Sequence, residues 1–108
     1  AYDRVTGNRD AKNVLAFCAE PRDPANDFAV RVFAPFYDVP EDPATGSSNG
    51  CLAAYLVHHG GEPVEARVEQ GHQLGRPSLV HIEAHEGDSS IHVDVGGRVF
   101  DVGRGKLE

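Results

Sequence analysis

The sequence has no hydrophobic run long enough to cross a membrane. A membrane-spanning helix needs roughly 18 or more consecutive apolar residues, and the longest apolar run, residues 51–57, is far shorter. No signal peptide is recognisable at the N-terminus. Because the chain begins with Ala1 rather than methionine, we expect a processed terminus or a piece of a longer protein. We therefore expect no membrane partner and a cytoplasmic location.

Basic residues are also scarce, and they do not form a cluster. The chain has 10 Lys and Arg residues against 17 Asp and Glu residues, a formal net charge of −7. Nucleic-acid binding needs a basic face that can neutralise phosphates. The charge balance therefore argues against a nucleic acid as the main partner.

Only two cysteines are present, Cys18 and Cys51, and their spacing fits neither a metal site nor a redox motif. Their neighbours in the sequence are apolar, which predicts two buried, reduced thiols. Three histidines fall on predicted strands near the C-terminus. His81 and His85 would lie about 13 Å apart on one strand, too far for a shared metal ion. We expect these histidines to pair across strands with acidic residues, and we expect no metal.

The length of 108 residues suits one domain, residues 1–108. Twelve glycines and seven prolines indicate many turns between short elements. Residues 47–59 are the one convincing helix, ended by Gly60 and Gly61. Alternating apolar residues predict strands at residues 13–19, 28–34, 64–69, 78–85, 90–95 and 98–103.

The last three strands can be aligned by their alternation. A turn at residues 86–89 would set Ile82 opposite Val93, and a second reversal at residues 96–97 would set Val93 against Phe100. On the polar face, the same alignment predicts the pairs Glu83–His92 and His81–Asp94. The result would be a meander with one apolar face and one polar face.

The predicted helix has no broad polar face, because residues 51–57 are all apolar. A helix that is apolar on all sides must be covered on every side. With one such helix and about six amphipathic strands, we expect an α+β fold. Its curved, mostly antiparallel sheet would form a half-barrel wrapped around one central apolar helix.

The segment EDPATGSSNG, residues 41–50, leads directly into that helix. The first amide groups of a helix have no partner within the helix. Thr45 or Ser47 could cap them, with Gly46 and the turn at Asp42 serving only the local geometry. Alternatively, the amides and hydroxyls stay open and bind a carboxylate, with Asp42 beside it as a general acid, base or orienting group.

Four segments, in order along the chain, resemble the C-terminal half of the PhzF family of phenazine-biosynthesis-type isomerases. The resemblance covers nearly the whole chain, and EDPATGS before a small-residue helix is its most specific part. The segments are RVFAP (31–35), EDPATGSSNGCLAAYL (41–56), EQGHQLGRPS (69–78) and VGGRVFDVGRGKL (95–107).

The resemblance implies a diaminopimelate epimerase-like fold of two similar domains with the active site between them. It implies isomerisation of a substrate such as trans-2,3-dihydro-3-hydroxyanthranilate by proton transfer, without cofactor or metal. In this reading Asp42 is a catalytic residue, and Gly46 and Ser47, with Thr45 of the same motif, bind a small carboxylate substrate. Cys51 lies a full turn inside the helix, which argues against a two-cysteine racemase mechanism.

The family's principal proton-shuttling glutamate belongs to the N-terminal half, and that half has no counterpart in this sequence. The resemblance therefore predicts a C-terminal domain or subunit, inactive alone, whose partner is the N-terminal half in the same or a separate chain. The alternative is a non-catalytic half-domain that forms a homodimer and binds a small acid or nothing. A third option is an epimerase acting on an amino-acid α-carbon through a different base.

Overall fold

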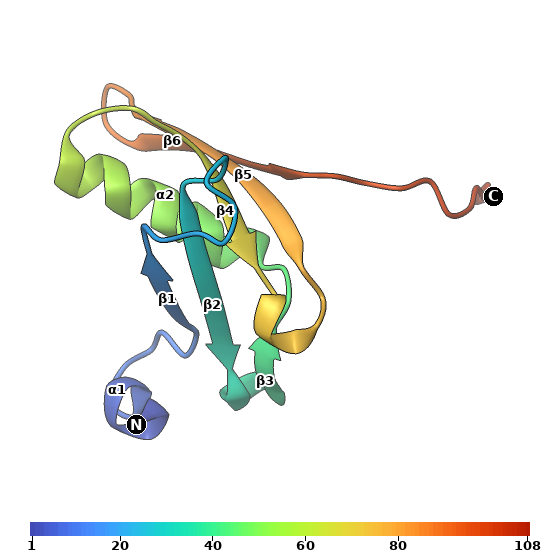
Figure 1. Ribbon diagram of the computed structural model, residues 1–108, viewed down its shortest axis with the longest axis horizontal. Helices are drawn as coiled ribbons and strands as arrows, with labels where there is room; N and C mark the ends of the chain where they lie inside the picture. Colours follow the sequence, from blue (N-terminus) through green and yellow to red (C-terminus); the bar gives the residue numbers. More distant parts are fainter.

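Six strands form one curved, mixed sheet in the computed structural model, which describes all 108 residues (Figure 1). The strand order is β1-β2-β4-β5-β6, and β3 pairs with β2 off this path. Only β2 and β4 run parallel. The elements are α1 (Tyr2–Thr6), β1 (Val14–Cys18), β2 (Phe28–Ala34), η1 (Pro35–Tyr37), β3 (Val39–Asp42), α2 (Gly46–Gly60), β4 (Val64–Gln70), η2 (His72–Leu74), β5 (Ser78–Glu86) and β6 (Ile91–Gly97).

The predicted helix is confirmed as α2, and its C-terminal end follows from one glycine. Gly61 adopts a left-handed conformation with φ of 73°, and its amide donates to the carbonyl oxygen of Val57 at 2.8 Å. This is the usual glycine ending of a helix, because glycine has no Cβ to clash there. Neither α2 nor α1 is long and apolar enough to cross a bilayer.

Helix α2 packs mainly on β5 and β6 and more lightly on β1 and β4. Its buried side carries Leu52, Ala53 and Val57, which belong to the apolar core. Its opposite side is open to solvent: Cys51 is exposed, and Tyr55 is 50% exposed. The expectation that the helix is covered on every side is therefore wrong for this chain. The core consists of Val30, Leu52, Ala53, Val57, Ala66, Val68, Val80, Ile82 and Ala84.

The expectation of two buried cysteines is also wrong, since Cys18 and Cys51 are both free and exposed. Cys18 is the last residue of the edge strand β1, and Cys51 lies on the open side of α2. Apolar neighbours in the sequence did not indicate burial here, because no other element of the chain covers these two positions.

The hairpin of β5 and β6 forms, but two residues out of the predicted register. Ile82 pairs with Val95 rather than Val93, because the loop comprises residues 87–90 and not 86–89. A shift of two residues keeps the apolar face apolar, so the alternation could not detect it. The predicted pairs of acidic residues with histidines are wrong: Glu83 faces Asp94, and the rings of His85 and His92 stack 5.1 Å apart.

The predicted strand at residues 98–103 is absent. Because of the shifted register, Gly96 and Gly97 pair with β5 as strand residues, so they do not reverse the chain. The segment after β6, residues 98–108, has no regular secondary structure and runs away from the body of the molecule (Figure 1). Its apolar side chains are highly exposed, with Val99 at 89% and Val102 at 97%.

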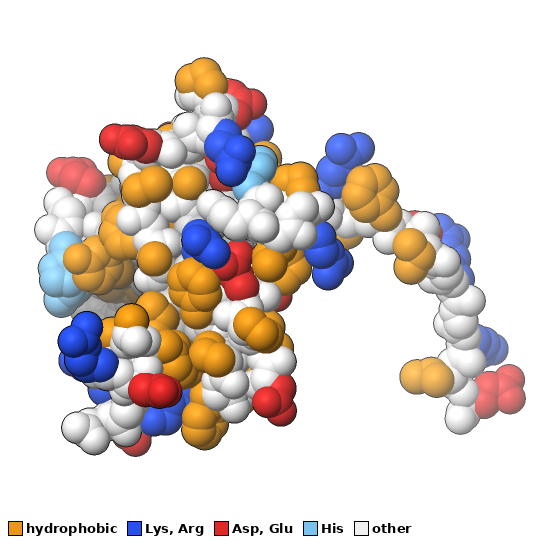
Figure 2. Space-filling view, turned by 60° about the horizontal axis from the view of Figure 1, so that its bottom comes forward, with side chains coloured by type: hydrophobic (Ala, Val, Ile, Leu, Met, Phe, Trp, Pro, Cys, Tyr) orange, Lys and Arg blue, Asp and Glu red, His pale blue; other side chains and the backbone are white.

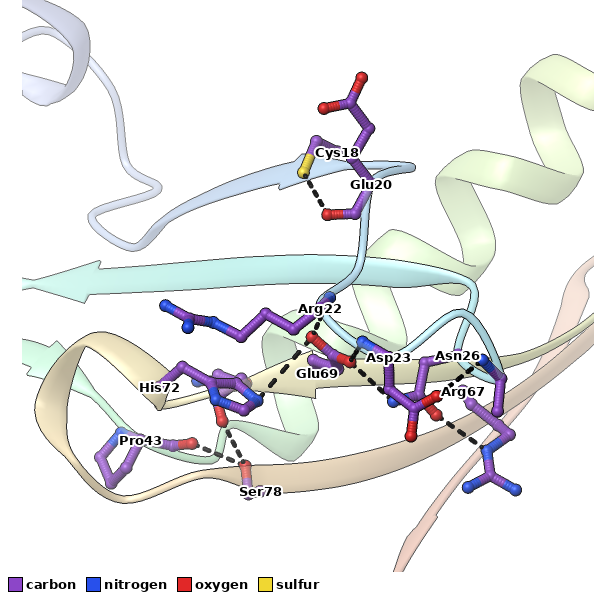
Figure 3. Close-up of polar contacts among 12 residues, drawn as sticks. Cys18, Glu20, Arg22, Asp23, Asn26, Pro43, Arg67, Glu69, His72 and Ser78 are labelled. Carbon is purple, nitrogen blue, oxygen red and sulfur yellow. Dashed lines mark hydrogen bonds and ion pairs between the residues drawn. The ribbon is translucent and has the colours of Figure 1, made fainter.

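Glu69 fastens the loop between β1 and β2 to strand β4 (Figure 3). Its carboxylate is only 4% exposed and accepts hydrogen bonds from the amides of Arg22 and Asp23 and the side chain of Asn26, each at 2.8 Å. Burial raises the pKa of Glu69, but these hydrogen bonds and the nearby His72 outweigh it and lower the pKa to about 2. The native fold therefore stabilises the ionised carboxylate.

Lowering the pH should destabilise the fold through Glu69. The folded-state pKa lies below the ordinary value of 4.5, so this stabilisation is complete above pH 4.5 and is lost as the pH falls toward 2. Glu69→Gln should lower the free energy of unfolding at pH 7 and flatten its decline between pH 4.5 and 2. Urea unfolding at a series of pH values measures this. The control is Glu65→Gln, at an exposed position of β4; identical pH slopes in the two variants would contradict the assignment.

Gly71, in the connection between β4 and β5, should tolerate no side chain. Gly75 in that connection should tolerate alanine with a modest loss of stability. Both glycines have positive φ, 85° and 67°. A Cβ on Gly71 would also lie 2.2 Å from the Arg76 oxygen and 2.7 Å from the Pro43 oxygen, whereas Gly75 has open space around it. We expect Gly75→Ala to lose about 1 kcal/mol and Gly71→Ala roughly 3 kcal/mol or more, measured by urea unfolding. Equal losses would show that the close contacts of Gly71 with Arg76 and Pro43 are unimportant.

Candidate functional site

The four predicted site residues lie where β3 ends and α2 begins: Asp42 is the last residue of β3, Thr45 precedes α2, and Gly46 and Ser47 are the first two residues of the helix. Strand β3, which the sequence analysis missed, pairs Asp42 with Val32 of β2 and so fixes Asp42 at the end of a strand. Arg31 of β2 reinforces this pairing, because its guanidinium donates to Glu41 Oε1 at 2.9 Å and 2.5 Å. Asp42 is thus placed by the sheet, three residues before Thr45, the N-cap residue of α2.

Thr45 stands at the N-cap position of α2 but does not cap the helix. Its hydroxyl donates instead to Asp42 Oδ2 at 2.5 Å. The side chain of Asp42 is half-buried, and no hydrogen bond of the chain ends on its second oxygen, Oδ1. Thr45 therefore holds one carboxylate oxygen of Asp42, and the other has no partner in the chain.

The first three amides of α2, those of Gly46, Ser47 and Ser48, have no hydrogen-bond acceptor in the chain. The amide of Asn49 is the first to be paired, with the carbonyl oxygen of Thr45 at 3.2 Å. Aligned amides at a helix N-terminus carry a partial positive charge, which favours an anion. Of the two interpretations, a capped helix and an open one, the geometry agrees with the open one.

Gln70, at the end of β4, was not identified from the sequence, although it makes the most hydrogen bonds to this segment. Its side chain is 1% exposed. The amide nitrogen donates to the Asp42 carbonyl oxygen at 2.7 Å and to Thr45 Oγ1 at 2.9 Å. The amide oxygen accepts from the Thr45 amide at 3.2 Å and from Asn49 Nδ2 at 2.9 Å. One buried side chain therefore ties β4 to both the segment and the helix.

Two further residues of the EQGHQLGRPS motif, Gly71 and Ser78, contact Pro43 in the same segment. Ser78 donates its hydroxyl to the carbonyl oxygen of Pro43 at 2.8 Å and is also 3.2 Å from that of Gln70 (Figure 3). Gly71 has no Cβ and so lets the chain pass close to Pro43. The motif thus acts as the support on which the Asp42–Thr45 segment rests.

A hollow of about 510 Å³ lies beside the first turns of α2. Of the four predicted site residues only Ser47 lines it; Asp42, Thr45 and Gly46 do not. The wall opposite the helix consists of residues 10–13, Leu15 and Tyr37. The hollow therefore adjoins the open amides without containing Asp42, and the role of each predicted site residue stays a prediction.

The sequence is similar to curated isomerases. It is 43% identical over 82 residues to the trans-2,3-dihydro-3-hydroxyanthranilate isomerase of Pseudomonas fluorescens, an alignment that covers 71% of this chain and 29% of that protein. It is 40% identical over 78 residues to an uncharacterized isomerase of Deinococcus radiodurans, covering 67% of this chain and 25% of that protein. The aligned part thus spans less than a third of either relative.

The fold is similar to that of a solved structure, the PhzF-family phenazine biosynthesis protein of Bacillus anthracis. The TM-score is 0.71 at 23% identity, and the match covers 79% of this chain and 31% of the other. The family described as phenazine biosynthesis-like protein, PhzC-PhzF, matches residues 2–105. Since this match spans nearly the whole sequence, the chain belongs to the PhzC-PhzF family.

Proposed function

We propose that this chain is the C-terminal domain or subunit of a PhzF-like isomerase that moves a proton on a small carboxylate substrate. The observation that carries the proposal is the row of unpaired amides at Gly46, Ser47 and Ser48, preceded at the end of β3 by a carboxylate whose Oδ1 has no partner in the chain. The Pseudomonas fluorescens relative is named for isomerisation of trans-2,3-dihydro-3-hydroxyanthranilate, which carries a carboxylate.

In this proposal the start of α2 holds the substrate carboxylate, with the Ser47 hydroxyl as an additional donor. Asp42 Oδ1 faces the reacting part of the substrate and gives or takes the proton, or orients it. Thr45 holds the other oxygen of Asp42 and so fixes the direction of the carboxylate. A proton shift of this kind needs no change of oxidation state, so we propose that the reaction proceeds without a cofactor.

We also propose that the site is completed by an N-terminal half, in the same or a separate chain, as in a diaminopimelate epimerase-like pair of domains with α2 at the centre of this one. The open side of α2 supports this, because Tyr55 and its neighbour Phe17 of β1 are 50% and 43% exposed. Figure 2 shows apolar side chains gathered on one face of the body and along the projecting C-terminal segment. Exposed apolar surface of this kind is typical of an interface.

The alternative is a non-catalytic half-domain that forms a homodimer through the same apolar surface and binds a small acid or nothing. The exposed Phe17 and Tyr55 agree with this alternative too, because a second copy could cover them. The two proposals differ in whether the amides and Asp42 act on a substrate.

Removing the Asp42 carboxylate should abolish turnover in the completed enzyme. We expect Asp42→Asn to lower kcat about 100-fold or more, since a general acid or base contributes at least that much. Ser47→Ala should mainly raise KM. The measurement is solvent deuterium incorporation into trans-2,3-dihydro-3-hydroxyanthranilate by the chain mixed with an N-terminal half from the family. Asp88→Asn and Ser89→Ala, in the exposed β5–β6 loop, are matched controls. Unchanged turnover in Asp42→Asn would refute the site.

The isolated chain should turn over the same substrate very slowly and should expose its apolar surface. Adding the N-terminal half should restore turnover and give a one-to-one complex by light scattering. Tyr55→Lys should weaken this complex, because it places a charge on the surface to be covered. A homodimer that neither binds the N-terminal half nor turns over the substrate would instead establish the non-catalytic alternative.

A further inference from the structure

Thr45 has two possible partners for its hydroxyl. At the N-cap position, threonine ordinarily accepts a hydrogen bond from the second or third amide of the helix, here Ser47 or Ser48. In this chain the hydroxyl donates to Asp42, neither amide donates to it, and those two amides have no acceptor. Something in the structure must therefore favour Asp42 over the helix.

Gln70 provides that preference through its amide nitrogen. The nitrogen donates to Thr45 Oγ1 at 2.9 Å, and together with the bond from Thr45 to Asp42 Oδ2 it fixes the position of the hydroxyl oxygen, in which no helix amide donates to it. The Thr45 hydroxyl donates its hydrogen to the Asp42 carboxylate, because an ionised carboxylate can accept hydrogen bonds but cannot donate them. A second bond from Gln70, to the Asp42 carbonyl oxygen at 2.7 Å, holds the turn at this geometry.

The amide group of Gln70 can adopt only one orientation in this place. Its oxygen accepts from the Thr45 amide and from Asn49 Nδ2, and its nitrogen donates to two oxygens. The reversed amide would set oxygen against oxygen at Asp42 and nitrogen against nitrogen at Asn49. The side chain is fully buried and makes four hydrogen bonds, so its orientation is fixed.

We infer that Gln70 is a positioning residue that keeps the N-terminus of α2 uncapped by holding the Thr45 hydroxyl on Asp42. This deepens the proposed function, on which its consequence for substrate binding rests: the amides of Ser47 and Ser48 stay available for a carboxylate. A threonine cap is typically worth a factor of about five in the local equilibrium. If the hydroxyl were released, it would compete with a bound anion to about that extent.

The test compares four variants of the full chain by NMR: Gln70→Met, Thr45→Val, the double variant, and the control Gln73→Met at an exposed position of η2. Methionine matches the length of glutamine without its polar atoms, and valine matches threonine without its hydroxyl. Two quantities are measured: hydrogen exchange of the Ser47 and Ser48 amides, and sodium acetate affinity from the amide shifts of Gly46 to Ser48.

In Gln70→Met we expect slower exchange of the Ser47 and Ser48 amides and acetate affinity about five-fold weaker, because Thr45 turns to cap the helix. Adding Thr45→Val to Gln70→Met should restore both quantities to the wild-type values, since no hydroxyl remains to compete. A loss of packing alone would not be restored by a second substitution. Failure of Thr45→Val to restore them, or no change in a folded Gln70→Met, would overturn the inference.

The wild-type chain supplies a measurement that needs no variant. Its Ser47 and Ser48 amides should exchange at rates close to those of an unstructured peptide in the absence of acetate. Protected amides would mean that Thr45 already caps the helix, which would overturn the inference even if Gln70→Met does not fold. If acetate binds none of the proteins, the proposed anion site fails, whereas the exchange rates still decide the role of Gln70.

Discussion

The candidate site depends on one buried amide, the side chain of Gln70. It lies where a sheet strand, a loop and a helix converge, and each of these would otherwise leave a polar group unpaired away from water. An unpaired buried donor or acceptor destabilises a fold by about 1–3 kcal/mol. Because all four hydrogen-bonding positions of Gln70 are used, the segment from Asp42 to Thr45 can be rigid without regular structure of its own.

This arrangement gives a physical reason for two motifs that lie far apart in the sequence. EDPATGS supplies the carboxylate and the helix start, and EQGHQLGRPS supplies Gln70, Gly71 and Ser78, all of which contact the first motif. A glutamine that donates, a glycine that allows close approach and a serine that binds the Pro43 carbonyl act on the same few residues. The second motif thus supports the first.

Most of the helices and strands that build the core were predictable from the sequence, whereas β3, the β5–β6 register and the contacts of Gln70 were not. Helix α2 and five strands follow from local periodicity and from the glycine at position 61, which is why they were found. Strand β3 is four residues long and contains Pro40, so it carries no strand signal. The β5–β6 register differs by an even number of residues, which alternation cannot reveal. Gln70 was missed because its partners lie 21 to 28 positions away, and only the assembled sheet brings them together.

Strand β4 ends in two adjacent polar residues that bind different segments on opposite faces of the sheet. Glu69 points to one face and fastens the β1–β2 loop, and Gln70 points to the other and serves the start of α2. Neighbouring strand residues face opposite ways, so displacing β4 by a single position would place either Glu69 at the start of α2 or Gln70 at the β1–β2 loop, depending on the direction of the shift. Either shift would remove both sets of hydrogen bonds. Insertions and deletions in β4 should therefore be far less tolerated during evolution than in the exposed turn between β5 and β6. The length of β4 sets where Glu69 and Gln70 meet their partners.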